Sequence, residues 1–218
     1  MVGAQREMTK RTLWAAIALA AVGAAAGTLL LGPSLLAPGA PDEEIAVDRT
    51  ARGSFALVDH TGRPVTDRDF HGRFMLVFFG YTFCPDVCPT DLQAIGVAVN
   101  ALGEAGKRVQ PIFVTLDPER DTAEALARYV THFHPQFLGL TGTPEEVAIA
   151  AQAYGVIYLK AMQAQGGTGA EGPRYVVDHS AYIYLLGPDG RFLAAFAHGT
   201  EPKQLAAGIL KHLKAHRS

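Results

Sequence analysis

Residues 74–92 of this chain read FMLVFFGYTFCPDVCPTDL, and the rest of the sequence is organised around them. The stretch opens with an apolar run that ends at Gly80, a pattern typical of a strand buried on both faces, although periodicity alone also allows a buried helix segment. The two cysteines of the chain, Cys84 and Cys88, follow directly. Pro89 and apolar residues at helical spacing come next, which predicts a helix from about Pro89.

The cysteine pair is therefore predicted to lie at or just before a helix N-terminus. The partial positive charge there stabilises an anion, so a thiolate forms more easily than elsewhere. A structural disulfide is the alternative, but it would close a very small loop and remove little entropy from the unfolded chain. Two cysteines also cannot form the disulfide framework of a small secreted protein. A pair in this position is better explained by chemistry than by cross-linking.

Length and composition allow one domain of ordinary size with appendages. The chain has 218 residues, of which 49% are hydrophobic, so a sizeable core is expected and wholesale disorder is not. Its formal net charge is -2, from 19 basic and 21 acidic residues. This near balance argues against nucleic-acid binding as the main function.

The N-terminal part predicts a membrane anchor. Residues 1–11 contain three basic side chains, residues 12–31 contain no charge, and residues 42–44 are all acidic. An uncharged stretch of this length spans a bilayer as a helix, and the basic flank predicts a cytoplasmic N-terminus with an exported C-terminal body. A cleaved signal peptide is the alternative, because residues 23–27 are rich in Ala and Gly. The apolar run continues past these alanines, which favours the anchor, and a buried core helix is disfavoured because the span has no polar face.

Residues 32–53 are predicted to be a linker, because Pro, Gly and acidic residues dominate them. The domain is predicted to occupy residues 54–218. Sequence patterns predict strands or short apolar stretches at 54–59, 74–80, 109–116, 137–140 and 156–159, and a β-hairpin formed by 181–186 and 191–196. Helices are predicted from about 89 to 103, from Asp121, from a Thr143–Glu146 capping box and over 202–215. Residues 161–173 are predicted to form a flexible loop. The predicted class is α/β, with a mixed sheet covered by helices.

Four segments together resemble the signature of the Sco/SenC family. They are residues 80–89, 117–122, 140–142 and 175–180, in the family's order, and they extend over roughly residues 54–215. The resemblance implies a thioredoxin-like fold anchored by one N-terminal transmembrane helix. It also implies a copper protein that helps to assemble the dinuclear copper centre of cytochrome c oxidase. The family's metal ligands correspond here to Cys84, Cys88 and His179.

These three residue types suit copper. Two thiolates and one imidazole make a soft site that selects copper(I), and imidazole also serves copper(II). Three protein ligands do not complete a structural zinc site, which needs four. The C-x-x-x-C spacing of Cys84 and Cys88 places both sulfurs on one side of a helical turn, whereas thioredoxin-type oxidoreductases use C-x-x-C. Most histidines are surface or hydrogen-bonded residues, so His179 is raised to a ligand chiefly by the resemblance. Asp178 is either an orienting partner of its imidazole or a simple loop acid.

Two functions of different class follow. The first is a copper metallochaperone in the cytoplasmic (inner) membrane, with its domain on the periplasmic side, that docks on the copper-centre subunit of the oxidase. The alternative is a thiol–disulfide oxidoreductase in which Cys84 or Cys88 attacks the disulfide of the same subunit's copper-ligating cysteines. The chaperone ranks first, because a third ligand and the longer spacer are superfluous to disulfide exchange. Other copper carriers or thiol reductants are further possible partners, and a redox or copper sensor is a third hypothesis that the sequence does not separate from these two.

Overall fold

The computed structural model describes residues 45, 47–48, 50–162 and 175–216. The predicted segment 1–11, the predicted anchor 12–31 and most of the predicted linker 32–53 lie outside these residues, as does most of the loop predicted at 161–173. No helix in the described part of the chain is both long enough and apolar enough to span a bilayer.

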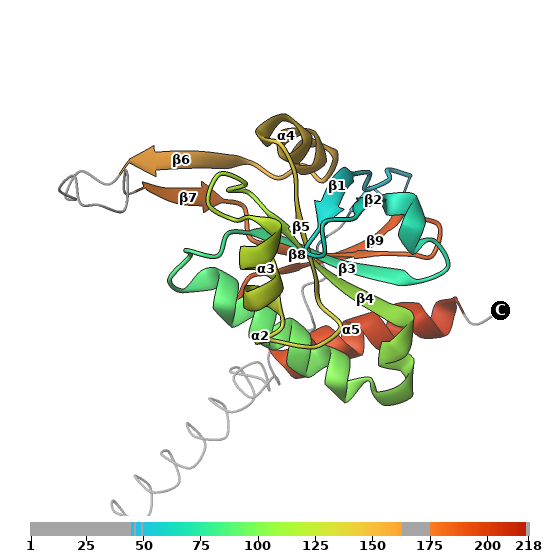
Figure 1. The fold of residues 1–218 in the computed structure, drawn as a ribbon. Helices are drawn as coiled ribbons and strands as arrows, with labels where there is room; N and C mark the ends of the chain where they lie inside the picture. Colours follow the sequence, from blue (N-terminus) through green and yellow to red (C-terminus); the bar gives the residue numbers. More distant parts are fainter. Residues whose placement is uncertain (1–44, 46, 49, 163–174, 217–218) are drawn as a thin grey trace, which may run out of the picture. The chain divides into compact units, whose positions relative to one another are not determined.

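A mixed sheet forms the centre of the domain (Figure 1). The strands of the described residues are β1 Ala56–Asp59, β2 Pro64–Thr66, β3 Phe74–Gly80, β4 Val109–Thr115, β5 Leu138–Thr141, β6 Tyr158–Met162, β7 Tyr175–His179, β8 Tyr182–Leu186 and β9 Phe192–Ala197. Seven of them form one sheet in the order β2-β1-β5-β4-β3-β8-β9, while β6 and β7 pair as a separate antiparallel hairpin. Within the large sheet β3, β4 and β5 are parallel and the other pairs are antiparallel.

Helices flank this sheet, as the predicted α/β class requires. The α-helices of the described residues are α2 Val87–Ala101, α3 Ala123–Val130, α4 Pro144–Ala153 and α5 Pro202–Ala215, and two short 3-10 helices are η2 Asp67–Phe70 and η3 Gly103–Arg108. Helix α2 packs against α5, α3 lies against β5 and α4 lies beside β1 (Figure 1). The predicted capping box at the start of α4 is confirmed, since the Thr143 hydroxyl accepts a hydrogen bond from the Glu146 amide and the Thr143 amide donates to the Glu146 carboxylate.

Strand β3 is the predicted strand buried on both faces. All of its residues are buried, and it lies between β4, with which it is parallel, and β8, with which it is antiparallel. Full burial of one Phe or Leu side chain stabilises a fold by about 1.5–3 kcal/mol, so this run is a major contributor to the core. Its last residue, Gly80, directly precedes the cysteine loop, which we define as residues 81–86. The core thus fixes where this loop leaves the sheet.

Two helix starts differ from the sequence expectations, as do three strands: β2 and β7 were not predicted, and β6 runs over Tyr158–Met162 where a strand at 156–159 was predicted. Helix α2 begins at Val87 with Asp86 as its N-cap residue, so Cys84 precedes the helix and Cys88 lies in its first turn. Helix α3 is capped by the Thr122 hydroxyl, which accepts a hydrogen bond from the Ala125 amide, and not by Asp121. The segment Tyr175–His179 is strand β7, which the sequence analysis did not predict and which pairs with β6.

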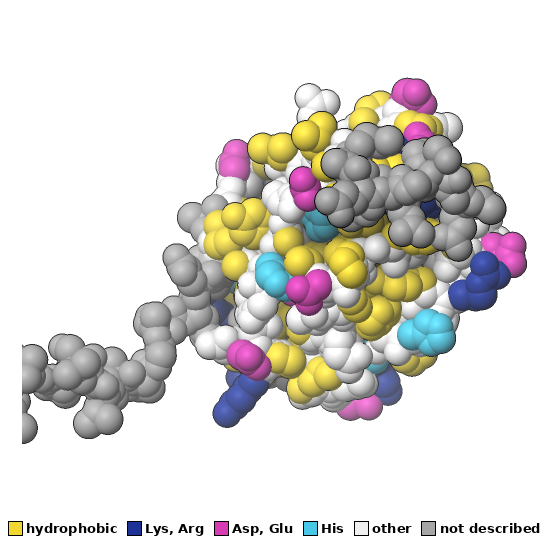
Figure 2. All heavy atoms as spheres, turned by 90° about the vertical axis from the view of Figure 1, so that its left-hand side faces the viewer, with side chains coloured by type: hydrophobic (Ala, Val, Ile, Leu, Met, Phe, Trp, Pro, Cys, Tyr) yellow, Lys and Arg dark blue, Asp and Glu magenta, His cyan; other side chains and the backbone are white. Residues whose placement is uncertain are grey.

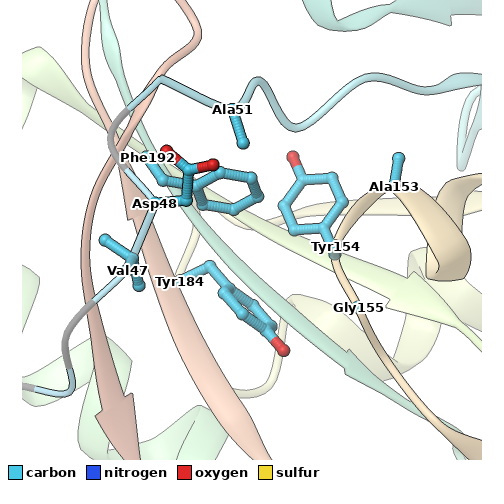
Figure 3. Close-up of a pocket in the computed structure, with 8 residues that line it drawn as sticks. All are labelled: Val47, Asp48, Ala51, Ala153, Tyr154, Gly155, Tyr184 and Phe192. Atoms are coloured by element: carbon cyan, nitrogen blue, oxygen red, sulfur yellow. The ribbon is translucent and has the colours of Figure 1, made fainter.

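An apolar pocket of about 240 Å³ opens beside the N-terminal part of the domain (Figure 3). The rings of Tyr154, Tyr184 and Phe192 form its wall and pack at centroid distances of 5.2–5.9 Å from one another. None of the residues that line it is a predicted metal ligand. The pocket is therefore separate from the site described next.

Candidate metal centre

The fold brings the three predicted ligands together from three elements. Cys84 lies in the cysteine loop, Cys88 in the first turn of α2, and His179 is the last residue of β7. The Cys84 sulfur accepts a hydrogen bond from the Cys88 amide at 3.4 Å, and the Cys88 sulfur lies 3.7 Å from Nε2 of His179. Both cysteines are free thiols.

The spacing of Cys88 and His179 suits two ligands of one ion. A sulfur at about 2.3 Å and a nitrogen at about 2.0 Å from a trigonal metal lie about 3.7 Å apart. The separation of 3.7 Å between Cys88 Sγ and His179 Nε2 matches this value. The three side chains form a series of pairwise contacts and not a closed cage, since no group of three or more His, Cys, Asp or Glu in the described residues is already arranged to hold a metal.

A backbone carbonyl orients the His179 ring. Nδ1 lies 3.2 Å from the carbonyl oxygen of Ser180, so the proton sits on Nδ1 and the lone pair of Nε2 faces Cys88. The edges of Phe78 and Tyr81 pack against the same ring at centroid distances of 6.3 Å. Asp178, for which the sequence left open an orienting role or that of a simple loop acid, is exposed, and strand alternation places it on the face opposite to His179. The Ser180 carbonyl makes the contact for which Asp178 was considered.

In the reduced protein the negative charge of the cysteine pair resides on Cys84. The thiol of Cys88 donates a hydrogen bond to Cys84, and together with the amides of Cys88 and Asp86 this lowers the pKa of Cys84 to about 5, although partial burial opposes the shift. The pKa of Cys88 is raised, because its proton is held in this hydrogen bond and the side chain is fully buried. The reduced pair therefore presents an outer thiolate on Cys84 and an inner, protonated Cys88.

This charge distribution predicts the reactivity of the metal-free, reduced protein. We expect alkylation of Cys84 by iodoacetamide to rise with pH through a midpoint near 5, because the thiolate is the reactive form. For an ordinary cysteine the alkylation rate has its midpoint at a pH of about 8.5. The measurement is the alkylation rate against pH, with the modified residue identified by peptide mass spectrometry. A wild-type midpoint close to that of ordinary cysteine would contradict the assignment.

Glycine at position 80 leaves room for the inner thiol. A Cβ atom on Gly80 would lie 2.7 Å from the Cys88 sulfur and 3.0 Å from the ring of Phe113. Real Cβ atoms do not approach so closely, so any other residue here would displace the sulfur. The sequence showed Gly80 only as the end of a strand, since its contact with Cys88 arises when α2 folds back onto β3.

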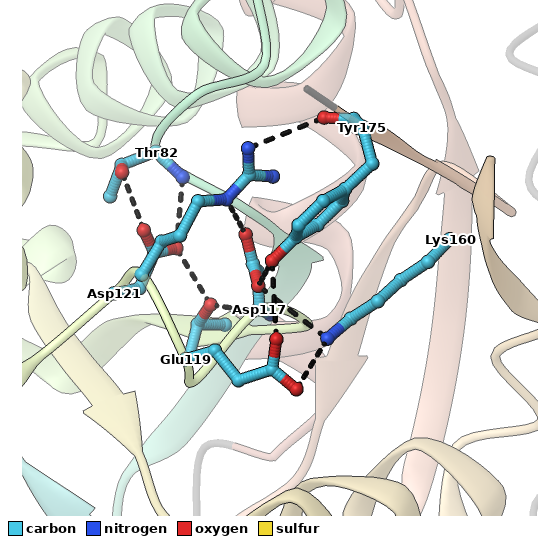
Figure 4. A network of polar contacts seen from close by, with 8 residues as sticks. Thr82, Asp117, Glu119, Asp121, Lys160 and Tyr175 are labelled. Carbon is cyan, nitrogen blue, oxygen red and sulfur yellow. Dashed lines mark hydrogen bonds and ion pairs between the residues drawn. The ribbon is translucent and has the colours of Figure 1, made fainter. Parts of the chain in front are cut away.

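The cysteine loop is tied to the sheet through a buried acid. The Asp121 carboxylate accepts hydrogen bonds from the Thr82 amide at 2.9 Å, the Thr82 hydroxyl at 2.5 Å and the Thr115 hydroxyl at 2.7 Å (Figure 4). Asp121 is fully buried, and this desolvation raises its pKa. Asp121 lies in segment 117–122, one of the four segments that carry the family resemblance. The sequence therefore marked this segment, but it did not predict that Asp121 holds the cysteine loop.

Exposed apolar side chains lie on the cysteine loop and near the hairpin of β6 and β7. Figure 2 views the domain from the side on which the hairpin of β6 and β7 lies, and hydrophobic side chains gather on this face. Large exposed apolar residues of the cysteine loop and of the hairpin region are Phe83, Ile157, Leu159 and Tyr182. Exposed apolar surface near a reactive centre is typical of a surface that meets another molecule.

The fold and the site define a class of protein. A mixed α/β domain with two free thiols at a strand-to-helix junction, and an imidazole beside them, is a thioredoxin-like domain suited to thiol or soft-metal chemistry. The SCO1/SenC family model matches residues 44–214. The chain belongs to the SCO1/SenC family.

Known relatives agree with this membership. The human mitochondrial protein SCO2 homolog is 44% identical over 169 residues, which are 77% of this chain and 61% of the human protein. The chain thus matches less than two thirds of the length of this curated relative. Two solved structures with copper bound are similar: Arabidopsis thaliana ScoI, 34% identical with a TM-score of 0.69, and Bradyrhizobium japonicum ScoI, 39% identical with a TM-score of 0.65. Each likeness covers 76% of this chain and 99% of the other.

Proposed function

We propose that this protein is a copper metallochaperone whose ligands are Cys84, Cys88 and His179. The observation that supports it most strongly is the contact between Cys88 and His179, which are 91 positions apart in the chain and meet at 3.7 Å. Copper is bound in the solved structures of two relatives, and two thiols with one imidazole are the soft donor set that copper(I) prefers. Copper is the cargo in this proposal and not a resident cofactor.

The protonation states of the site suit reversible loading. Cys84 is already a thiolate near neutral pH, so it is the first sulfur to meet an incoming ion. Cys88 must lose its proton when it binds, because only the thiolate is a metal ligand. Copper binding is therefore coupled to proton release, and protonation of Cys88 favours unloading. Three ligands leave an open side through which an acceptor can take the ion.

We further propose the acceptor and the location. The acceptor is the subunit of cytochrome c oxidase that holds its dinuclear copper centre, as the family resemblance implies. The exposed Phe83, which directly precedes Cys84, supports direct docking of a partner protein. The uncharged stretch 12–31 anchors the chain in the cytoplasmic membrane and places the domain on the periplasmic side.

A second function is favoured by the low pKa of Cys84. In disulfide exchange the Cys84 thiolate attacks a client disulfide, and one client sulfur leaves as a thiolate. The Cys88 sulfur then attacks the mixed disulfide, which releases the second client thiol and leaves a Cys84–Cys88 disulfide. The client gains two electrons, and an external dithiol must reduce this disulfide before the next cycle. His179 is not needed for these steps.

Copper binding by the purified full-length protein tests the proposal. We expect one copper(I) per reduced wild-type chain, no stoichiometric copper after oxidation of the two thiols, and weaker binding for His179→Ala. The matched control is His132→Ala, since His132 is exposed at the end of α3 and far along the chain from the ligands. His179→Ala should retain the reduction of a client disulfide. Wild-type copper affinity in His179→Ala would refute the three-ligand site, and cycling without copper binding would favour the oxidoreductase.

A further inference from the structure

The hairpin of β6 and β7 carries His179 but is not part of the large sheet. It forms its own two-stranded sheet, and residues 180–181 lead from the end of β7 into β8. This short connection holds the base of the hairpin. The tilt of β7 about that base, and with it the direction of the His179 ring, depends on contacts made farther along the strand.

We propose that Arg120 is a positioning residue that holds β7 against the cysteine loop and so maintains the contact of His179 with Cys88. The proposal rests on the proposed function for the identity of the metal, but the docking of the hairpin is a property of the metal-free chain. Arg120 contacts Tyr81, Phe83 and Tyr175 and neither the sulfurs nor the His179 ring, so it acts through its neighbours.

One guanidinium group contacts both parts of the site. Its central carbon lies 3.8 Å from the centroid of the Tyr175 ring on β7 and 4.8 Å from the Phe83 ring in the cysteine loop. Phe83 directly precedes Cys84, and the same guanidinium donates a hydrogen bond to the Tyr175 carbonyl at 3.3 Å. The Phe83 ring is 63% exposed and packs against this cation.

A buried carboxylate holds Arg120 in this place. Nε of Arg120 donates to Asp117, which is fully buried and also accepts a hydrogen bond from the Tyr175 hydroxyl at 2.6 Å (Figure 4). Lys160 on β6 lies 2.9 Å from Glu119 and 3.8 Å from Asp117. Both strands of the hairpin thus reach the loop after β4, and Arg120 is the member of this network that also reaches the cysteine loop.

Strand geometry connects Tyr175 to His179. Residues at alternate positions of a strand share a face, so Tyr175, Val177 and His179 all face the same side. Val177 between them is buried, which makes this the side turned toward the domain. Over these positions a strand extends about 13 Å, so Tyr175 and His179 lie at opposite ends of β7. Release of Tyr175 therefore lets β7 tilt about its base at residues 180–181, which turns the His179 ring out of its direction toward Cys88.

The first test uses the metal-free, reduced full-length protein. Amide hydrogen exchange of residues 175–179 is compared among wild type, Arg120→Lys and Arg120→Ala. Lysine keeps a charge beside Asp117 but lacks the planar group that stacks on Tyr175 and Phe83, so both variants are expected to exchange at least about 10-fold faster in β7. The matched control is Arg128→Ala, which removes an exposed arginine whose partner is the exposed Glu124 on α3. Unchanged protection of β7 in Arg120→Ala would overturn the proposal.

The second test loads the same variants with copper(I). We expect the affinity of Arg120→Ala to fall by about 10- to 100-fold, as for other residues that orient a metal ligand. X-ray absorption at the copper edge should show loss of the nitrogen ligand while both sulfurs remain, as in His179→Ala. Phe83→Ala, which changes an exposed residue and leaves Arg120 paired with Asp117, should shift both readouts in the same direction by a smaller factor.

The outcomes separate this proposal from the proposed function. If His179→Ala weakens copper binding and Arg120→Ala does not, the positioning role is refuted and the metal site stands. If His179→Ala has no effect on copper, the three-ligand site fails, whereas faster exchange of β7 in Arg120→Ala would still establish the docking role. The positioning role of Arg120 would also be refuted if Arg120→Ala lost structure throughout while Arg120→Lys and Phe83→Ala left both the hydrogen exchange and the copper affinity unchanged.

Discussion

Replacement of Cys88 by alanine is expected to lower the copper(I) affinity of the reduced protein by more than about 100-fold. Residues that merely orient a metal ligand change affinity by about 10- to 100-fold, and removal of a ligand should exceed that range. Cys88 is the inner sulfur, fully buried and 3.7 Å from His179, so no neighbouring thiol replaces it. The measurement is competition with a chromogenic copper(I) chelator under anaerobic conditions.

The same substitution has a second effect that does not depend on copper. Alanine removes the thiol that donates to Cys84, so the pKa of Cys84 should rise from about 5 toward the ordinary cysteine range. Cys88→Ser is the matched control, because its hydroxyl still donates a hydrogen bond but is a poor ligand for copper(I). The Cys88→Ser variant should therefore lose copper binding, while the pKa of Cys84 stays well below the ordinary cysteine range. Copper affinity within about 10-fold of wild type in either variant would contradict the assignment of Cys88 as a ligand.

Replacement of Asp121 by alanine is expected to lower the free energy of unfolding by about 3–5 kcal/mol. The carboxylate accepts three hydrogen bonds, two from Thr82 and one from Thr115, and its loss leaves the buried Thr115 hydroxyl and the half-buried Thr82 donors without their acceptor. Each unsatisfied buried donor costs about 1–3 kcal/mol. The total stays below the sum of the maxima, because hydroxyl groups can rotate to other acceptors and because burial of Asp121 already has a cost, shown by its raised pKa.

Urea unfolding followed by circular dichroism measures this change. The matched control is Glu124→Ala, which removes a nearby acid whose ion pair with Arg128 is exposed and should change stability by less than about 0.5 kcal/mol. Since Thr82 lies in the cysteine loop, Asp121→Ala should also increase the exchange of amides in residues 81–86. A loss of less than about 1 kcal/mol would show that water or other acceptors satisfy the three donors.

Asp121 also shows where sequence reasoning stopped. An acid at the start of an amphipathic stretch predicts a helix N-cap, and a helix does begin there. The cap is nevertheless Thr122, while Asp121 turns inward to Thr82, which lies 39 positions earlier. The local pattern located the helix within one or two residues. The choice between two adjacent capping residues depended on a partner that only the folded chain brings near.

His179 and Asp178 show the same limit at the site. The resemblance selected His179, and the fold places it beside Cys88. Sequence proximity suggested Asp178 as the residue that orients the ring, but adjacent residues of a strand face opposite sides. The Ser180 carbonyl takes this position instead. Because the segment was not predicted to be a strand, this alternation was not available from the sequence.

The sequence by itself determined the elements whose signals are local. The apolar run before Gly80, the cysteine pair at a helix start, the Thr143–Glu146 capping box and the hairpin of β8 and β9 all follow from periodicity, caps and turn residues. Only the tertiary structure decided that Gly80 makes room for the Cys88 sulfur and that Arg120 joins the cysteine loop to β7. These contacts depend on which distant surfaces pack together, and packing is a property of the whole core that no short stretch of sequence encodes.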